Sequence, residues 1–94
     1  MVVLRFEHSA RHYEEWKKLF DSDPLHRKQS GVIRYRLYRS IERPSHVVLE
    51  FEFNTLNEAQ KTLTALEQFW EKTAGSIIVN PKYQLFDIVE SIEL

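Results

Sequence analysis

The sequence predicts a two-layer α+β domain in which both helices cover one face of a four-stranded antiparallel sheet. Apolar residues alternate with polar ones in four short runs, which is the pattern of half-buried strands. In two longer runs they recur every three or four residues, which is the pattern of amphipathic helices. The elements follow the order β-α-β-β-α-β, and short hairpins with right-handed crossovers connect this order into a ferredoxin-like sandwich. Residues 1–94 are expected to form this single domain.

The first strand is predicted over Val2–His8, where Leu4 and Phe6 alternate with charged side chains. Ser9 is the predicted N-cap of a helix over about residues 10–21. The apolar residues of this helix fall on one stripe, formed by Tyr13, Trp16, Leu19 and Phe20.

A short helical turn is predicted to begin at Asp23-Pro24, because an acidic cap followed by proline is typical of a helix start. This turn is expected to continue through Gln29. Gly31 is expected to end it, and the chain then enters a strand that begins at Val32.

Two alternating runs, VIRYRLYRS and HVVLEFEF, predict a hairpin with loop 41–45. Pairing Ser40 with His46 keeps the apolar and charged faces of the two strands separate. This register sets two Arg–Glu pairs across the hairpin, Arg36 with Glu50 and Arg34 with Glu52. The face expected to meet the helices carries Ile33, Tyr35, Leu37, Val47, Leu49, Phe51 and Phe53.

The second helix begins at a capping box, in which Thr55 precedes Glu58 by three residues. It is predicted to run to about Lys72, and Gly75 is expected to end it. Its buried stripe is predicted to consist of Leu56, Ala59, Leu63, Leu66, Phe69 and Trp70.

The last strand is predicted over Tyr83–Ile92, and Pro81 marks the turn before it. The residues of this segment, YQLFDIVESI, are rich in strand-forming types. Which of them face the helices is left open.

Composition excludes several classes of function. The 13 basic and 14 acidic residues balance, which argues against a dedicated binder of nucleic acid or anionic membranes. The chain has no cysteine, which excludes disulfides, thiolate catalysis and cysteine-ligated metals. The longest aliphatic run, at 77–79, is far too short to span a bilayer, and the first residues lack a signal-peptide pattern. We therefore expect a cytoplasmic protein.

The sheet face turned away from the helices is charged but neutral in sum. RNA-recognition domains share this element order and stack bases on outward aromatic residues. Here Phe51 and Phe53 are expected to point to the helices, while Glu50 and Glu52 point outward and would repel phosphate. Two alternatives remain. The face is either exposed to solvent and carries ion pairs between its strands, or it packs against a second copy of the chain.

Two stretches, residues 13–39 and 47–66, carry a resemblance to a known family. YEEWKKLFDSDPLHRKQSGVIRYRLYR and VVLEFEFNTLNEAQKTLTAL resemble the dimeric α/β-barrel superfamily, and most closely its small bacterial members of the antibiotic-biosynthesis-monooxygenase type. The resemblance implies a homodimer whose two sheets form a barrel, with a cleft in each protomer. It also implies a cofactor-independent monooxygenase-like or cyclase-like enzyme that acts on an aromatic or polyketide-type molecule. A non-catalytic, ligand-binding or stress-associated barrel is the alternative.

This chemistry suggests candidate site residues on the charged face. His46 and Tyr38 are the expected acid–base pair for a substrate hydroxyl. Arg34 or Arg36 would stabilise the resulting anion. The remaining pocket residues are expected to be Glu50, Glu7 and, on the second helix, Trp70.

Haem is the cofactor that the family also uses, and its haem-degrading members place an asparagine, a tryptophan and a histidine around it. Trp70 matches the tryptophan position, whereas Glu7 or His8 occupies the region of the asparagine. Residues 71–94 contain no histidine for the iron. His12 and His26 also lack the partner spacing of a metal site. No metal and no cofactor are therefore expected, and haem stays as the alternative that the resemblance implies.

Overall fold

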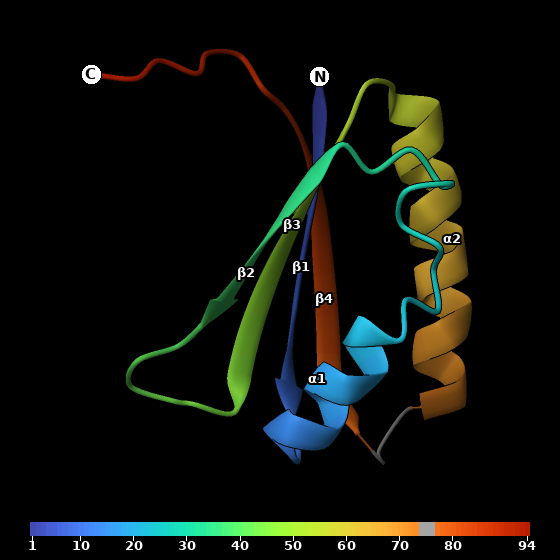
Figure 1. Cartoon of the computed structure of the whole chain (residues 1–94), viewed down its shortest axis with the longest axis vertical. Helices are drawn as coiled ribbons and strands as arrows, with labels where there is room; N and C mark the ends of the chain where they lie inside the picture. The colour runs from blue at the N-terminus through green and yellow to red at the C-terminus, as the bar shows by residue number, and fades with distance from the viewer. Residues whose placement is uncertain (74–76) are drawn as a thin grey trace.

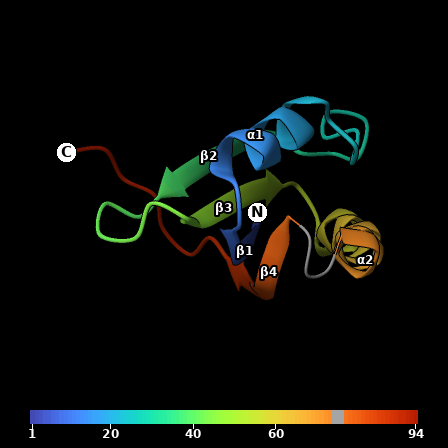
Figure 2. The ribbon, with the colours of Figure 1, turned by 90° about the horizontal axis from the view of Figure 1, so that it is seen from below.

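The computed structural model describes residues 1–73 and 77–94, and it confirms the predicted element order (Figure 1). The elements are β1 (Val2–Ala10), α1 (Tyr13–Asp21), β2 (Arg34–Arg39), β3 (His46–Phe53), α2 (Leu56–Thr73) and β4 (Ile78–Asp87). The strands form one antiparallel sheet in the order β2-β3-β1-β4. Figures 1 and 2 show both helices on one side of this sheet, which is the ferredoxin-like arrangement.

The predicted hairpin register is confirmed. Ser40 donates its N–H to the carbonyl of His46 at 3.0 Å, and Arg34 and Arg36 lie opposite Glu52 and Glu50. The Arg34 Nε atom lies 3.1 Å from Glu52 Oε2. The cross-strand ion pair therefore selects the register that the alternation predicts.

The core lies between the sheet and the two helices. The inner-face residues of β1 and β3 are buried as predicted: Leu4, Phe6, Val47, Leu49, Phe51 and Phe53. Trp16 of α1 and Leu63, Leu66 and Trp70 of α2 cover them. At the edge strand β2, by contrast, Tyr35 and the preceding residue Ile33 remain 44% exposed, because the helices leave this margin of the sheet partly open.

One of the two hydrogen bonds of the predicted capping box is present at the start of α2, and the glutamate side chain binds the threonine hydroxyl. Thr55 Oγ1 accepts the N–H of Glu58 at 3.2 Å and donates its hydroxyl hydrogen to Glu58 Oε1 at 3.0 Å. The helix continues to Thr73. Gly75, its predicted end, lies outside the described residues.

The prediction that Ser9 caps α1 is wrong. Strand β1 continues through Ala10, because Ser9 pairs with His46 on one side and Val79 on the other. The helix begins only at Tyr13, and His12 occupies its N-cap position without a side-chain capping hydrogen bond. Pairing to both neighbouring strands thus outweighs a local capping preference.

The predicted helical turn over 24–29 is also wrong, since the segment forms a succession of turns. Asp23 and His26 have φ angles of +58° and +50°, which no right-handed helix accommodates. Asp23 Oδ1 instead accepts the N–H of Arg27 at 3.0 Å. Gly31 closes the segment with a φ of +98°, a conformation that glycine adopts at no steric cost, and regular pairing of β2 begins at Arg34 rather than Val32.

The last strand lies earlier in the sequence than predicted. It begins at Ile78 and passes through Pro81, because β4 is an edge strand and Asn80, with a φ of +52°, provides a bulge opposite the Glu7–Ser9 stretch of β1. It ends at Asp87, which pairs with Val2, the first residue of β1. Residues 88–92, the last part of the predicted strand, are therefore not part of the sheet that the described residues form.

Candidate functional site

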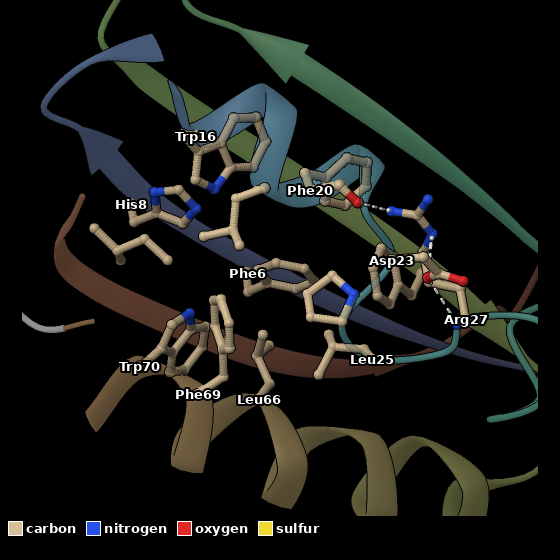
Figure 3. A pocket seen from close by; sticks show the side chains of 14 residues that line it. Phe6, His8, Trp16, Phe20, Asp23, Leu25, Arg27, Leu66, Phe69 and Trp70 are labelled. Carbon is tan, nitrogen blue, oxygen red and sulfur yellow. Dashed lines mark hydrogen bonds and ion pairs between the residues drawn. The ribbon is translucent and has the colours of Figure 1, made fainter. Parts of the chain in front are cut away.

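A narrow cleft lies between the inner face of the sheet and the two helices (Figure 3). Its free volume is about 30 Å³. Strand β1 contributes Phe6 and His8, α1 contributes Trp16 and Phe20, α2 contributes Phe69 and Trp70, and the 23–27 segment closes one end with Leu25 and Arg27. Both tryptophans of the chain thus line the cleft.

His8 is the buried titratable group of this cleft. Its side chain is 1% exposed and its ring packs against Trp16 with the ring centres 5.2 Å apart. Burial lowers the pKa of His8 to about 4, and nearby His46 acts in the same direction, against the opposing effect of the Ser9 carbonyl. The imidazole is therefore neutral at neutral pH.

The tautomer of His8 follows from its hydrogen bond. The Nδ1 atom lies 3.3 Å from the Ser9 carbonyl oxygen, so Nδ1 carries the hydrogen and donates it. The Nε2 atom then keeps its lone pair. Figure 3 shows the ring at the end of the cleft opposite Arg27, with Trp16 and Trp70 nearby, so a ligand in the cleft meets a hydrogen-bond acceptor there.

The walls of the cleft are aromatic. Trp16 and Phe20 stack with their ring centres 5.3 Å apart and their planes 20° apart. The ring centres of Phe6 and Trp70 lie 6.0 Å apart. Such walls favour a flat apolar ligand, because ring faces supply large contact area with little loss of conformational freedom.

Arg27 closes the far end of the cleft. Its Nη1 donates to the Phe20 carbonyl at 3.0 Å, and its Nε lies 3.2 Å from Asp23 Oδ1. The guanidinium carbon stands 4.1 Å above the centre of the Phe20 ring and 4.8 Å from that of Tyr35. This cation is thus fully engaged and fixes the 23–27 segment against α1 and β2.

The structure divides the predicted site residues between the two faces of the sheet. Trp70 lines the inner cleft, whereas all the others lie on the outer face: Glu7, Arg34, Arg36, Tyr38, His46 and Glu50. His46 Nε2 lies 3.4 Å from Glu7 Oε2, and the Tyr38 hydroxyl donates to Glu50 Oε1 at 2.7 Å. His46 and Tyr38 are therefore each held by a different carboxylate and are not joined to each other.

Sequence reasoning missed the role of His8, because it placed this residue where the first strand was expected to end. The available signal was parity, since His8 alternates with Leu4 and Phe6 and so shares their buried face. Trp16 and Phe20 were recognised as core residues but not as cleft walls. Within the described residues, no group of three or more histidine or acidic side chains could hold a metal ion. None of the described helices is long and apolar enough to cross a membrane.

Comparison with solved structures places this arrangement among known folds. The chain superposes on SnoaB, a cofactor-independent oxygenase from Streptomyces nogalater, with a TM-score of 0.76, 15% identity and coverage of 97% of this chain and 95% of SnoaB. It superposes on the haem degrader MhuD from Mycobacterium tuberculosis with a TM-score of 0.74, 14% identity and coverage of 99% and 100%. Structures provisionally named antibiotic biosynthesis monooxygenases also match. The chain has the ferredoxin-like fold that these proteins share.

A third match bears on assembly. A ferredoxin-like protein from an uncultured marine organism, described as dimeric, aligns over 100% of both chains with a TM-score of 0.67 and 10% identity. No protein-family model and no curated protein matches the sequence. At these identities the likeness establishes the fold.

The MhuD structure contains two haems in its active site, so the fit of haem to this cleft can be tested. The cleft offers one buried imidazole, His8, but its free volume of about 30 Å³ is far below the ~300 Å³ at which ligand pockets begin. Haem does not fit the cleft in this conformation. Haem therefore has no part in the chemistry proposed for this cleft.

Proposed function

We propose that the chain is a cofactor-independent, monooxygenase-like enzyme that acts on a small hydroxyaromatic molecule bound in the inner cleft. The observation that carries this proposal is a neutral, buried imidazole facing an aromatic-walled cleft. The fold itself occurs in an oxygenase that needs no cofactor, SnoaB, which supports the proposal without assigning a substrate.

In the proposed reaction, the aromatic walls hold the substrate and His8 Nε2 accepts a hydrogen bond from its hydroxyl group. Because burial disfavours the imidazolium ion, the proton transfers to His8 only as electron density leaves the substrate for dioxygen. Once the substrate fills the cleft, no space remains for water, which protects the reactive intermediate. Entry of an aromatic ring requires the 23–27 segment to move outward, because the present volume admits only molecules of the size of water or dioxygen.

Intrinsic fluorescence and oxygen uptake together test this proposal. Naphthols and anthrones are suitable probes, and because both tryptophans line the cleft, binding should quench fluorescence saturably. His8→Leu should reduce oxygen uptake by about a hundredfold or more, while quenching persists. The matched control, His46→Gln with Tyr38→Phe, should retain turnover.

The alternatives give different results. If the His46→Gln, Tyr38→Phe variant lost turnover while His8→Leu stayed active, the active site would lie on the outer face instead. Saturable quenching without oxygen uptake for any probe would favour a non-catalytic ligand-binding protein. Absence of quenching would contradict the inner cleft as a binding site.

We further propose that the chain is a cytoplasmic homodimer whose outer sheet faces meet. The outer face mixes charged groups with apolar side chains, since Tyr38 and Phe86 are 43% and 41% exposed there beside half-buried Val3 and Val48. Exposed aromatic side chains of this kind are enriched at protein interfaces relative to the rest of the surface. The matching dimeric ferredoxin-like protein supports the same assembly.

Reversing one charge should disturb this dimer. Arg36→Glu places a second carboxylate beside Glu50 on the outer face, and burying two like charges in the proposed interface is unfavourable. Light scattering at low micromolar concentration should therefore give a lower mass than for the wild type. Lys61→Glu, on the exposed side of α2, is the control and should leave the mass unchanged. A wild-type monomer in both low and high salt would contradict the proposed assembly.

A further inference from the structure

An open groove lies beside the inner cleft, at the exposed edge of β2. We call it the β2-edge groove; it lies between the 23–28 segment and residues 32–35, and its volume is about 580 Å³. Asp23 and Arg27 line both the groove and the inner cleft. The two spaces therefore share one wall, and Figure 3 shows this wall at the end of the cleft away from His8.

Backbone hydrogen bonds hold the walls of the groove in place. Val32 donates its N–H to the Arg27 carbonyl at 3.0 Å, which ties the start of β2 to the 23–28 segment. Ile33 donates its N–H to the Glu52 carbonyl of β3 at 2.8 Å, which joins the same wall to the sheet. The groove is therefore preformed, and its volume lies within the roughly 300–1,000 Å³ of ligand pockets.

Lys28 gives the groove an uncompensated positive charge. Among the described residues that line it, three are basic, Arg27, Lys28 and Arg34, and one is acidic, Asp23. Arg27 binds Asp23, with Nε 3.2 Å from Oδ1, and Arg34 pairs with Glu52. Lys28 is exposed and forms no ion pair with any described residue. One cation without a partner attracts a singly charged anion such as a carboxylate.

Aromatic surface continues from the cleft into the groove. Phe20 lines the cleft, and its ring centre lies 5.3 Å from that of Tyr35, which lines the groove. Arg27 covers both rings, with its guanidinium carbon 4.1 Å and 4.8 Å from their centres. Tyr35 and Ile33 are each 44% exposed and give the groove that Lys28 lines an apolar surface. This surface favours the flat part of a ligand, as the cleft walls do.

The two ends of the combined space differ in chemistry. At the inner end, His8 Nε2 keeps a lone pair and accepts a hydrogen bond. At the groove end, the ammonium group of Lys28 can only donate hydrogen bonds. A flat ligand whose hydroxyl group meets His8 therefore turns its opposite end toward Lys28.

We infer that the β2-edge groove binds the acidic group of the substrate, with Lys28 as the partner of its carboxylate. The substrate class is then a hydroxyaromatic acid whose hydroxyl group and carboxylate lie at opposite ends of the ring system. The inference rests on the proposed function. It goes further by naming the second functional group of the substrate and the residue that recognises it.

Isothermal titration calorimetry at pH 7 tests this inference with two probes, 6-hydroxy-2-naphthoate and its methyl ester. The ester keeps the ring system and the hydroxyl group but carries no charge. We expect the acid to bind the wild type about tenfold more tightly than the ester, because a charge-assisted hydrogen bond to Lys28 is added. High salt should reduce this preference, since Lys28 is exposed.

Two charge reversals separate a specific contact from the overall charge of the protein. Lys28→Glu should weaken binding of the acid about tenfold and leave that of the ester within about twofold. Lys61→Glu, on the exposed side of α2, changes the net charge by the same amount and is the matched control. It should alter neither dissociation constant.

Amide chemical shifts of the ¹⁵N-labelled wild type locate the carboxylate independently of any substitution. The shifts that differ between the acid and ester complexes should gather in residues 27–35. Equal affinities for acid and ester, equal effects of Lys28→Glu and Lys61→Glu, or shift differences gathered elsewhere would overturn the groove as the carboxylate site and leave the inner cleft standing. Absence of binding by both compounds would overturn the inference together with the proposed function.

Discussion

Lowering the pH from 7 to 4 is expected to reduce the free energy of unfolding by roughly 3 kcal/mol through His8 alone. Burial lowers the pKa of His8 from 6.5 to about 4 in the folded protein. Between these two values the unfolded chain binds a proton that the folded chain does not, so acid favours unfolding in this window. Above pH 6.5 the imidazole is neutral in both states, and the penalty disappears.

Urea denaturation at pH 7, 6, 5 and 4 measures this effect. In His8→Leu the pH dependence between 6.5 and 4 should be shallower than in the wild type by the same roughly 3 kcal/mol. His12→Gln removes an exposed imidazole and is the control, so it should follow the wild-type curve. Identical curves for the wild type and His8→Leu would show that His8 does not stay neutral in the folded protein.

Phe51→Ala is expected to reduce the free energy of unfolding by about 3–5 kcal/mol. Phe51 is completely buried in β3, and its ring meets that of Phe6 edge-on with the centres 5.0 Å apart. The rings of Tyr35 and Phe20 lie 6.1 Å and 6.5 Å away. Truncation removes contacts with three elements at once and leaves a void that the sheet cannot close.

Chemical denaturation at one fixed protein concentration checks this value, since the proposed dimerisation would add to the apparent stability. Phe51→Leu retains most of the apolar volume and should lose clearly less than Phe51→Ala. Ile41→Ala, in the exposed hairpin loop, should change stability by less than about 0.5 kcal/mol. Equal losses in Phe51→Ala and Ile41→Ala would contradict the central place of Phe51 in the core.

The sequence was sufficient to predict the order of elements, the hairpin register and the buried face of β3. These follow from period-two alternation and from opposite charges on facing strands, both of which are local properties. The errors have a common origin. Ser9, Pro81 and the end of β4 were interpreted from local capping and turn preferences, whereas pairing with β1 and β3 determines where the strands begin and end.

The candidate site was harder to predict than the fold. The alternation of apolar and polar residues shows which residues share a face of the sheet, but it does not show which face lines a cleft. His8 becomes a site residue only because Trp16, brought by α1, and Trp70, brought by α2, enclose it. The segment around Arg27 closes the cleft through two left-handed residues, Asp23 and His26, and neither has a reliable sequence signature for that conformation.

Strand β3 separates the two proposed properties of the protein, ligand binding and self-association, residue by residue. Its inward positions, such as Phe51, shape the cleft and the core, while the next positions on either side, Glu50 and Glu52, belong to the face proposed for assembly. Substitutions at alternate positions can therefore change ligand selectivity and self-association independently over evolution. Insertion or deletion of a single residue in this strand would instead exchange the two sets, and it should be far less tolerated than any single substitution nearby.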